Sequence, residues 1–550
     1  MRAAALAGLA AVVALTAASP AMGGRFAVGL ERGVSPAKVA DRVRQATGGT
    51  VSTIAPFALT LQAPSVRGVA GLAGVAYVER LDHARRLSFT ATDPLAKRQW
   101  YLDAINAFNF WPQVPLFRPP VHVAVIDSGI DASHPEFEGK IEDARSFVDN
   151  QPRKDAQGHG TFVAGLIAAE VNNAQGIAGI GFPVKLLVAK VVRADGTISP
   201  EAEAKAIRWA VESGAQVINL SLGGTRDPLQ RGRDTFSQLE ASAIDYAVRH
   251  DVVVVAAVGN GDQAPSFPWA YANYPAALPH VIGVSAVARD NSVPTFSNRD
   301  AVYNDLSAPG EDILSTLPRA LTEVRPACDE QGYSSCGSRE FKRGDGTSFA
   351  APQVSAAAAL MLSEEPSLKP EQVSLLLRRS ATDVNALNGC RQCQVEHDAL
   401  SGWGRLDVEA ALRSAHEALP GTDQFEPNDE AGYRAATLGK RKRALKVQAT
   451  LDYWDDRVDV YRVWLRRGQR FTAALNGPGE IVADLRLWRP GTRALQRRFP
   501  GSATRPVRRA TGFAQTKRLK PYRVLTTGWH YLEVKASAPG WGRYALSLKR

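Results

Sequence analysis

The chain has 550 residues, more than a single hydrophobic core organises and enough for two to four domains. Hydrophobic residues make up 45% and charged residues 22%, an ordinary globular composition that excludes disorder as the main state. The formal net charge of +11 is unevenly spread. Residues 421–550 hold 27 Lys and Arg against 11 Asp and Glu, a net of +16, which leaves −5 for the rest of the chain.

The first residues have the pattern of a secretory signal peptide. The positive start Met1-Arg2 precedes an almost unbroken apolar run over 3–18, and small residues suited to cleavage follow at 19–21. No later stretch reaches the 18 or so apolar residues that a membrane span needs. We therefore expect residues 1–24 to be a signal peptide. The mature protein is then a monomer without a membrane span, secreted to the periplasm or the extracellular space.

Residues 25–91 predict a small α/β unit. A strand pattern over 25–31 leads into an amphipathic helix over 35–47, and a second strand pattern over 76–82 closes the unit. From 92 to 417, apolar strands alternate with helical patterns, which predicts an α/β fold with a parallel sheet covered by helices on both faces. Near-continuous Val and Ile runs suit strands that are buried on both faces. These strand candidates are 121–127, 185–192, 216–222 and 251–260.

Residues 418–550 predict a different architecture. A joint rich in Pro, Asp and Asn at 420–429 is followed by short stretches in which apolar and polar residues alternate, separated by turn residues. This pattern is typical of an antiparallel β-sandwich. The clearest alternating stretches are 458–465, 483–488, 530–534 and 544–549.

Three short motifs place reactive side chains at the carboxyl ends of predicted strands or at the starts of predicted helices. Asp127 ends a strand, His159 precedes a helical run, and Ser348 opens another. A serine hydroxyl becomes a nucleophile when an imidazole removes its proton, and a buried carboxylate holds that imidazole in the right tautomer. The start of a helix also offers unpaired backbone N–H groups to a developing oxyanion.

VIDSGID (125–131), GHGTFVAG (158–165) and GTSFAAPQVS (346–355) together resemble the three signature blocks of the subtilisin (subtilase) family. The likeness extends over roughly residues 93–415. It implies a subtilisin-like fold and a secreted serine endopeptidase that acts on protein or peptide substrates.

The resemblance also assigns individual roles. Asp127 is implied as the orienting acid, His159 as the general base and acid, and Ser348 as the nucleophile. AAVGNG (256–261) resembles the block that supplies an oxyanion-hole asparagine, here Asn260.

The substrate-binding residues follow from the same resemblance. The strand SLGG (221–224) resembles the one on which substrate backbone is added as an extra strand. The chain departs from the family at NYPA (273–276), where Asn273 stands in place of the common glycine and would narrow the specificity pocket or make it polar. The residues implied are Ser221, Leu222, Gly223, Ala257, Gly259 and Asn273.

VNNAQGI (171–177) resembles the family's calcium loop, with companion carboxylates expected upstream of it. Hard oxygen ligands of this kind suit Ca²⁺, and a hydrogen-bonded surface turn is the alternative. The implied ligands are Asp93, Glu136, Val171, Asn173, Gln175 and Ile177.

The flanking segments have resemblances of their own. Residues 25–91 resemble the family's inhibitory propeptide, which predicts self-cleavage between about Arg85 and Lys97; a permanent N-terminal domain is the alternative. Residues 418–550 resemble the pre-peptidase C-terminal domain of secreted bacterial proteases. The net charge of this part predicts attraction to an anionic surface or polymer, or is only an Arg-rich surface. Its acidic cluster binds calcium or forms a polar turn, and comprises Asp452, Asp455, Asp456 and Asp459.

Four cysteines fit an oxidising compartment. Cys328 and Cys336 lie eight apart, and Cys390 and Cys393 form a C-x-x-C, so two local disulfides are the simplest of three possible pairings. A zinc site made from four thiolates is the alternative, but a second C-x-x-C is missing.

Two further functions compete with a general endopeptidase. Asn273 and the cysteine-containing insertion leave room for a narrow processing protease or an exopeptidase. A secreted binding protein with a vestigial protease core is the alternative from another class, and the complete set of catalytic residues argues against it. Sequence motifs of metalloproteases, α/β-hydrolases and phosphate-binding loops are absent.

Overall fold

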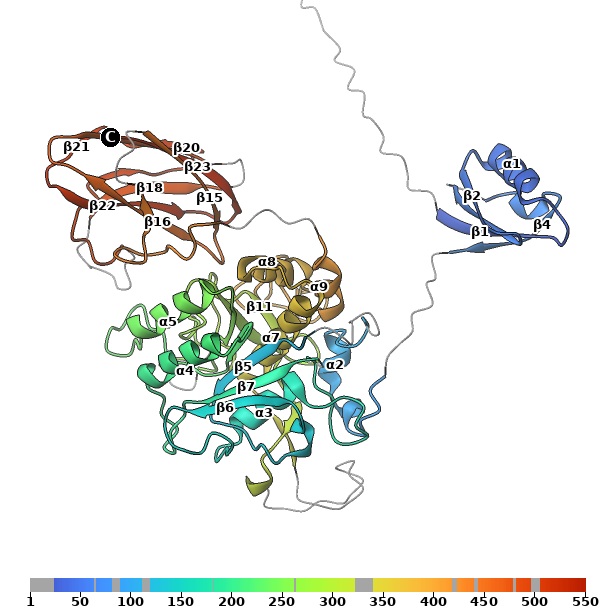
Figure 1. Cartoon of the computed structure of the whole chain (residues 1–550), viewed down its shortest axis with the longest axis horizontal. Coiled ribbons are helices and arrows are strands. Elements are labelled where there is room, and N and C mark those ends of the chain that lie inside the picture. The colour runs from blue at the N-terminus through green and yellow to red at the C-terminus, as the bar shows by residue number, and fades with distance from the viewer. Residues whose placement is uncertain are drawn as a thin grey trace, which may run out of the picture. The chain divides into compact units, whose positions relative to one another are not determined.

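Figure 1 shows the computed structural model of the chain. Residue contacts divide it into two compact units, residues 1–87 and 88–550. Within the part that the structure describes, no helix is both long enough and apolar enough to cross a membrane. The described residues are 24–63, 66–81, 90–110, 119–181, 183–261, 264–321, 340–417, 423–439, 444–477, 481–495 and 505–550.

The N-terminal unit is a four-stranded antiparallel sheet in the order β2-β3-β1-β4, packed against one helix. Val39 and Val43 on the helix pack into one core with Leu59 and Leu61 on the sheet, as the predicted amphipathic pattern requires. The elements are β1 (Gly24–Leu30), α1 (Pro36–Thr47), β2 (Thr50–Ala55), β3 (Ala58–Ala63) and β4 (Val75–Arg80).

The second unit contains a seven-stranded sheet in the order β11-β10-β9-β8-β5-β7-β6, in which every pair is parallel. This confirms the predicted fold class, and the four predicted strands are β5, β7, β8 and β9. The strands are β5 (His122–Asp127), β6 (Ile141–Ser146), β7 (Lys185–Lys190), β8 (Val217–Leu220), β9 (Val253–Ala257), β10 (Val281–Val287) and β11 (Leu306–Pro309).

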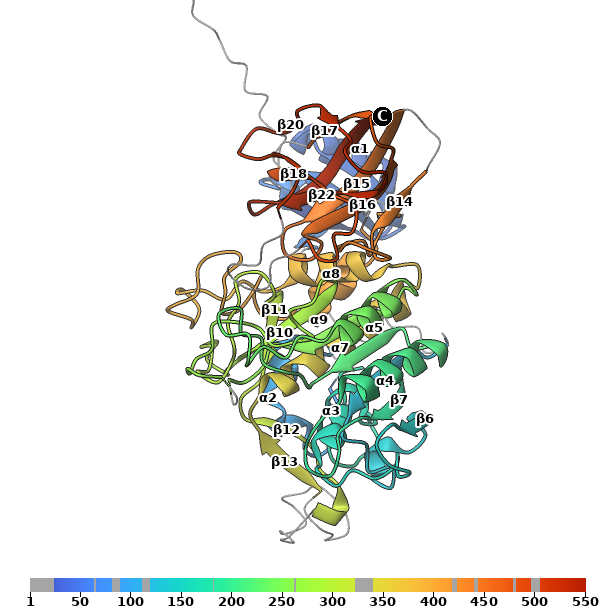
Figure 2. The same cartoon turned by 90° about the vertical axis from the view of Figure 1, so that its left-hand side faces the viewer.

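Both faces of this sheet are buried under helices, which Figure 2 shows from the side. Val123 and Val125 of β5 point into a core shared with α3, α7, α8 and α9, whereas Ala124 and Ile126 point into a second core under α4 and α5. The helices are α2 (Trp100–Ala104), α3 (His159–Ala168), α4 (Pro200–Glu212), α5 (Gln238–Val248), α7 (Thr347–Glu364), α8 (Pro370–Ser380) and α9 (Val408–Ser414); a hairpin, β12 (Ile313–Thr316) with β13 (Phe341–Gly344), precedes α7.

The C-terminal part is a two-sheet β-sandwich, as predicted. One sheet has the order β14-β16-β22-β18-β19 and the other β15-β23-β17-β20, with β21 paired to β17. Leu485 and Leu532 of the first sheet share a core with Leu546 and Phe471 of the second. Only one of its pairs, β14 with β16, is parallel among the described strands. The strands are β14 (Ala436–Leu438), β15 (Ala444–Asp452), β16 (Val458–Leu465), β17 (Arg470–Asn476), β18 (Ala483–Trp488), β19 (Arg508–Ala510), β20 (Thr516–Arg518), β21 (Tyr522–Arg523), β22 (Gly528–Ala536) and β23 (Trp541–Lys549).

Charged groups join the sandwich to the α/β part within the second unit. Arg378 of α8 is only 5% exposed, and its Nη2 lies 2.7 Å from Asp452 Oδ2 and 4.0 Å from Asp455 Oδ2. Burial by itself lowers the pKa of Arg378, but the two carboxylates outweigh burial and raise it above its ordinary value. The guanidinium therefore stays charged and bridges the two parts.

Arg378→Ala leaves Asp452 and Asp455 without their buried counter-charge. We expect it to lower the free energy of unfolding by about 3–5 kcal/mol, the usual result of removing one partner of a buried pair. Thermal and urea denaturation midpoints of the full chain measure this. The matched control is Arg379→Ala next door, whose partner Glu417 is 3.6 Å away and half exposed; its effect should stay below about 1 kcal/mol. Equal effects of the two substitutions would show that the buried pair does not stabilise the protein.

Candidate active site

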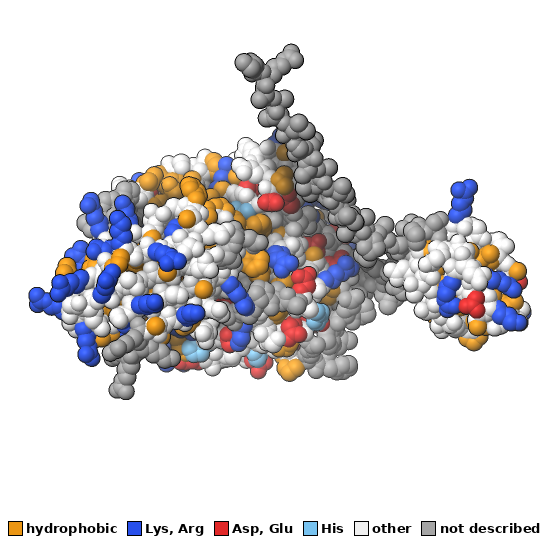
Figure 3. Space-filling model, turned by 90° about the horizontal axis from the view of Figure 1, so that it is seen from above, with side chains coloured by type: hydrophobic (Ala, Val, Ile, Leu, Met, Phe, Trp, Pro, Cys, Tyr) orange, Lys and Arg blue, Asp and Glu red, His pale blue; other side chains and the backbone are white. Residues whose placement is uncertain are grey.

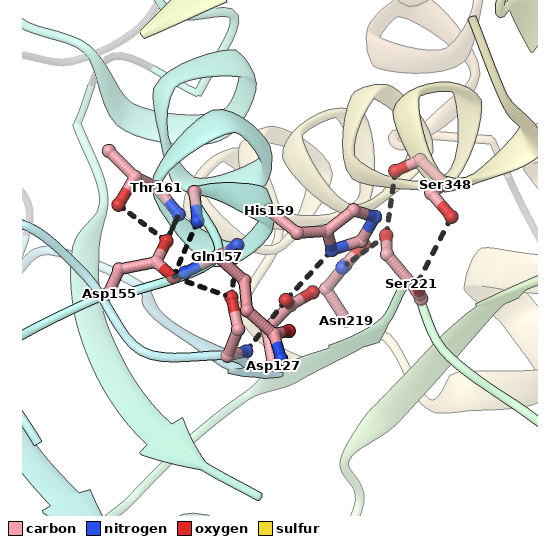
Figure 4. A network of polar contacts seen from close by, with 11 residues as sticks. Asp127, Asp155, Gln157, His159, Thr161, Asn219, Ser221 and Ser348 are labelled. Atoms are coloured by element: carbon pink, nitrogen blue, oxygen red, sulfur yellow. Dashed lines mark hydrogen bonds and ion pairs between the residues drawn. The ribbon is translucent and has the colours of Figure 1, made fainter. Parts of the chain in front are cut away.

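His159 and Asp127 come from neighbouring elements at the carboxyl edge of the parallel sheet. Asp127 is the last residue of β5 and only 1% exposed, and His159 is the first residue of α3. His159 Nδ1 lies 2.8 Å from Asp127 Oδ1 (Figure 4), so the carboxylate holds the proton on Nδ1 and leaves Nε2 free to act as a base. The backbone N–H of Ser128 donates to the same oxygen at 2.7 Å, which fixes the carboxylate.

The surroundings tune the basicity of the imidazole. Burial by itself lowers the pKa of His159, but the negative charge of Asp127 and the hydrogen bond to it more than compensate, so the pKa is raised above its ordinary value. The ring is 35% exposed and therefore remains accessible from the solvent side. Phe349 packs against it, with ring centroids 5.7 Å apart.

Ser348 lies in the first turn of α7, close to the imidazole. Its Oγ donates to the carbonyl of Ser221 at 3.1 Å, and Ser221 Oγ donates back to the carbonyl of Ser348 at 2.8 Å. Figure 4 shows His159 between Asp127 and this pair of serines. The Ser348 hydroxyl is thus hydrogen-bonded to a carbonyl and must turn about its Cα–Cβ bond to reach His159. Hydrogen bonds between such groups are often incomplete in enzymes without substrate.

A buried polar chain behind the nucleophile was not predicted from the sequence. Ser355 Oγ donates to Asn219 Oδ1 at 2.8 Å, and Asn219 Nδ2 donates to Ser221 Oγ at 3.0 Å. The chain thereby links α7 to the end of β8 and fixes the position of Ser348 through Ser221. The spacing Asn219-x-Ser221 at a strand end was the only sequence signal, and its meaning depends on the packing of α7.

The side-chain amide of Asn260 is held in one orientation. Its Oδ1 accepts from the N–H of Thr347 at 2.9 Å and from Thr347 Oγ1 at 2.8 Å, so both donors fix which way the amide faces. A Cβ at Gly346 would lie 3.4 Å from Asn260 Nδ2 and 3.7 Å from the backbone N of Ser348. The two nitrogen atoms therefore lie within 4 Å of one point beside Gly346 and Ser348.

Comparison with known proteins shows which family the chain is similar to. The sequence profile of the subtilase family matches residues 119–404. The chain is 37% identical over 243 residues to the thermophilic serine proteinase of Bacillus sp. (strain AK1), which covers 44% of this chain and 52% of the relative. It is 32% identical over 358 residues to Subtilisin E of Bacillus subtilis (strain 168), covering 65% of this chain and 80% of the relative. It is 31% identical over 365 residues to Fervidolysin of Fervidobacterium pennivorans, which covers 62% of this chain and 48% of the relative.

The chain belongs to the subtilase family. It is accordingly a serine endopeptidase, and the resemblance that the three motifs indicated is confirmed. The match covers the parallel sheet and the helices α3, α4, α5, α7 and α8, while α2, α9 and the β-sandwich lie outside it.

Asp155 organises the helix of this subtilase that carries His159, and sequence reasoning missed it. Its Oδ1 accepts from Ser128 Oγ at 2.8 Å and from the N–H of Gly158 at 2.8 Å. Its Oδ2 accepts from the N–H and the hydroxyl of Thr161 at 2.8 and 2.7 Å. The buried carboxylate thus satisfies the open N–H groups at the start of α3 and ties them to the turn after Asp127. An Asp just before a predicted helix was the available signal.

The predicted substrate strand and pocket residues lie together. Gly224 pairs with Tyr274 through two backbone hydrogen bonds of 2.9 Å, which places the strand residues Ser221, Leu222 and Gly223 against the 273–276 segment. A Cβ on Gly223 would lie 2.0 Å from the Tyr274 carbonyl oxygen, so this close approach requires glycine.

Asn273, which the sequence predicts in the specificity pocket, is held in place by a buried hydrogen bond. Asn298, which is fully buried, donates from Nδ2 to Asn273 Oδ1 at 3.1 Å. A Cβ at Gly259 would come within 2.5 Å of Asn273 Nδ2, and Ala257 immediately precedes this turn at the end of β9. The polar amide of Asn273 therefore packs against Gly259. Beside the triad, a cavity of about 870 Å³ is lined by Ser128, Asp155, Gln157, Lys190, Pro318 and Arg319, among others.

The predicted calcium residues also come together, but hydrogen bonds occupy their oxygens. Asp93 accepts from the N–H groups of Asn172 and Asn173 at 3.0 and 3.2 Å. Glu136 accepts from the N–H of Ile177 at 2.8 Å and from Asn173 Nδ2 at 3.1 Å. Burial raises the pKa of Glu136 to about 8, and burial also raises the pKa of Asp93.

The loop over 171–177 is built around Glu136. Asn173 Oδ1 accepts from the N–H of Gln175 at 2.8 Å, and a Cβ on Gly176 would come within 1.9 Å of Glu136 Oε1. The oxygen donors suit Ca²⁺ by type, while the two carboxylates face N–H groups of the loop. Val171 is buried at the start of this loop.

The four aspartates of the acidic cluster in the C-terminal part lie in two different environments. Asp452 and Asp455 lie against Arg378, at 2.7 and 4.0 Å from its Nη2. Asp456 and Asp459 instead belong to groups of side chains that are close enough to hold a metal ion. Within the described chain these groups are His280, Glu426, Asp429 and Asp456, and Asp423, Glu426 and Asp459.

Cys390 and Cys393 form a disulfide with Cα atoms 5.3 Å apart, one of the two local pairs expected. The other pair, Cys328 with Cys336, lies outside the described residues.

The raised pKa of His159 predicts the acid limb of activity. Proton transfer needs a neutral imidazole, so kcat/KM should fall as the pH drops through that raised pKa. Asp127→Asn removes the main charge that raises the pKa. Its residual activity, lower by about 10⁴-fold, should therefore show an acid limb at lower pH. Peptide hydrolysis between pH 4 and 10, with the exposed Asp195→Asn as control, measures this. An unchanged limb in Asp127→Asn would contradict the assignment.

Proposed function

We propose that this subtilase is a secreted endopeptidase that cleaves peptide bonds through an acyl-enzyme on Ser348. The observation that carries the proposal is the buried Asp127 held 2.8 Å from His159, next to a serine flanked by two oxyanion donors. His159 Nε2 takes the proton of Ser348 Oγ as that oxygen attacks the substrate carbonyl. The negative charge that develops on the carbonyl oxygen is stabilised by Asn260 Nδ2 and the backbone N–H of Ser348.

The imidazolium then returns its proton to the leaving amine, and the first product departs. Water, deprotonated by the same imidazole, attacks the acyl-enzyme and restores the Ser348 hydroxyl. Asp127 stays ionised throughout and balances the charge on His159. The hydrogen bond from Ser348 to the Ser221 carbonyl breaks when the substrate arrives, because the hydroxyl must turn toward the imidazole.

Substrate specificity in this proposal comes from an extended peptide added along Ser221, Leu222 and Gly223. Asn273 shortens the pocket beyond Ala257 and Gly259 and places an amide in it. We infer a preference at the residue before the scissile bond for small or polar side chains over large apolar ones.

Residues 25–91 act as an inhibitory propeptide in this proposal, and the enzyme itself cuts the chain between about Arg85 and Lys97. The compact sheet with its own helix and core supports an independently folding segment. The cysteine-containing insertion before α7 and the polar pocket suit selective cleavage.

Calcium is proposed for the loop over 171–177, held by Asp93, Glu136 and Asn173 together with the backbone carbonyls of Val171, Gln175 and Ile177. The ion would neutralise the two carboxylates, whose burial otherwise favours their protonated forms. Its role would be to stabilise the turn that follows α3.

The C-terminal sandwich is proposed to bind an anionic surface or polymer. Figure 3 shows many Lys and Arg side chains at the end of the second unit where the sandwich lies. Exposed basic residues on its strands and loops support this. Among them are Arg466, Arg467, Arg470, Arg518, Lys520, Arg523, Arg543 and Lys549.

The intact mass of the secreted protein tests catalysis and maturation together. We expect the wild type to lose residues 25–91 and to gain the mass of one label after treatment with a fluorophosphonate. Ser348→Ala should retain the segment and take no label, because it lacks the nucleophile. Surface Ser242→Ala serves as the control and should behave like the wild type. Identical processing of the Ser348→Ala chain would mean that another protease matures it, and a labelled Ser348→Ala would reject the nucleophile.

Asn260→Ala removes one oxyanion donor. We expect kcat to fall about 10²–10³-fold with KM little changed, a magnitude taken from subtilisin itself, because the lost contact exists only in the transition state. Thr347→Val is the matched control: it removes one hydrogen bond to Asn260 Oδ1 but keeps Nδ2. A loss expressed mainly in KM would contradict the role of Asn260.

A further inference from the structure

A group of buried ionisable residues joins the α/β part to the β-sandwich, far along the chain from the catalytic residues. His280 precedes β10 and is only 6% exposed, and Glu426, Asp429 and Asp456 face it from the C-terminal part. One ligand atom from each of the four lies within 4.8 Å of the others. The group belongs to the second unit, where Arg434 also pairs with Asp245 across the same boundary.

The histidine of this group lies between two carboxylates. Both ring nitrogens are buried and without a hydrogen-bond partner, although Nε2 is 3.2 Å from Glu426 Oε2 and 3.4 Å from Asp429 Oδ2. Asp456 Oδ1 is likewise buried without a hydrogen-bond partner, and the residue is 4% exposed. A buried carboxylate oxygen without a hydrogen-bond partner is costly, so Asp456 Oδ1 points to a ligand that satisfies it.

Two of the six separations among the four ligand atoms are close to the edges of a tetrahedron around a small cation. Zn²⁺ binds a His nitrogen at about 2.0–2.1 Å and a carboxylate oxygen at about 2.0–2.2 Å, which separates neighbouring ligand atoms by about 3.3–3.6 Å. The two observed separations of 3.2 and 3.4 Å lie close to this range. They join atoms that face each other without hydrogen-bond geometry.

Charge balance favours a divalent ion as well. A protonated imidazole brings one positive charge to three carboxylates, whereas a divalent ion brings two and uses the neutral imidazole as a ligand. The nearby Arg434 and Arg378 already pair with Asp245 and Asp452.

The imidazole also discriminates between metals. Ca²⁺ takes six to eight oxygen ligands, while a nitrogen donor with three carboxylates suits Zn²⁺ and similar transition metals. The all-oxygen group, Asp423, Glu426 and Asp459, shares Glu426, whose Oε2 also accepts from the N–H of Asn428 at 3.0 Å. Its Asp423 accepts from the N–H of Thr450 at 2.8 Å, and its Asp459 accepts from Asn428 Nδ2 at 2.8 Å.

We propose that His280, Glu426, Asp429 and Asp456 bind one Zn²⁺ that fastens the β-sandwich to the α/β part. Because Glu426 and Asp429 lie in the segment entering the sandwich and His280 leads into β10, the ion joins residues about 150 positions apart in the sequence. His280 lies at the start of β10, at the edge of the sheet opposite to the one where Asp127 ends β5. The role of the ion is therefore structural.

Metal binding by the full chain tests the proposal. The Ser348→Ala chain, which cannot digest itself, is stripped with a chelator, dialysed against Zn²⁺ or Ca²⁺, and analysed for bound metal and thermal midpoint. We expect about one Zn²⁺ per chain and a midpoint that rises with free Zn²⁺. His280→Ala in the same background should reduce bound Zn²⁺ to background and abolish the rise.

His397→Ala is the matched control. His397 also comes from the α/β part and packs on Trp454 of the C-terminal part, with ring centroids 5.3 Å apart, but it lies outside the four-residue group. It should keep the bound Zn²⁺ even if docking weakens. Retention of Zn²⁺ by His280→Ala would overturn the proposal, as would binding of Ca²⁺ alone or of neither metal by the parent chain.

Two measurements keep the test valid if His280→Ala does not fold. Asp456→Asn removes one ligand with little change of volume and should reduce Zn²⁺ binding strongly. Co²⁺ substituted into the parent chain should give the visible absorption of a tetrahedral site, because geometry is diagnostic of such centres. A purely octahedral Co²⁺ spectrum would contradict the assignment.

Discussion

The structure of the catalytic region depends on the burial of α7. Nearly all of its residues from Ala350 to Ser363 are buried, and it packs against the sheet, α3 and α9 in one continuous core. A helix enclosed in this way cannot shift without opening the core, since protein interiors are close-packed. Ser348 lies in its first turn, so the position of the nucleophile is fixed by the same packing that stabilises the fold. The parallel strands β5 and β9 end at Asp127 and Ala257, so Asp127 and the turn that leads to Asn260 lie at the same edge of the sheet.

Around this frame, buried polar groups are paired across elements that are distant in sequence. Asp155 ties the start of α3 to the turn after β5, and Asn219 ties α7 to β8 through Ser221 and Ser355. Such groups are costly if left alone and become rigid when fully satisfied, which keeps a reactive site in one arrangement. Asn260 obeys the same rule, because both donors to its oxygen come from Thr347, next to the nucleophile.

Charged groups join the sandwich to the rest of the second unit, beside the packing of Trp454 on Trp403 and His397. Arg378 meets Asp452, Arg434 meets Asp245, and His280 meets the carboxylates of the entering segment. Buried ion pairs add specificity of placement more reliably than net stability. Several acidic residues of this basic domain thus lie at the contact with its neighbour, among them Asp452, Asp455, Glu426 and Asp429.

The sequence by itself determined the strands of the parallel sheet and the sandwich pattern, and it singled out the three residues that we propose as catalytic. Apolar runs and short motifs are local, so their chemistry can be inferred without knowing what packs against them. It also indicated Asn260 and the residues around the calcium loop. The tertiary structure decided the rest: that Ser348 rests on the Ser221 carbonyl, that Asp155 caps α3, that Arg378 takes two of the four clustered aspartates, and that His280 meets three carboxylates. Each of these depends on contacts between segments far apart in the chain, and the packing of α7, α8 and the sandwich selects them.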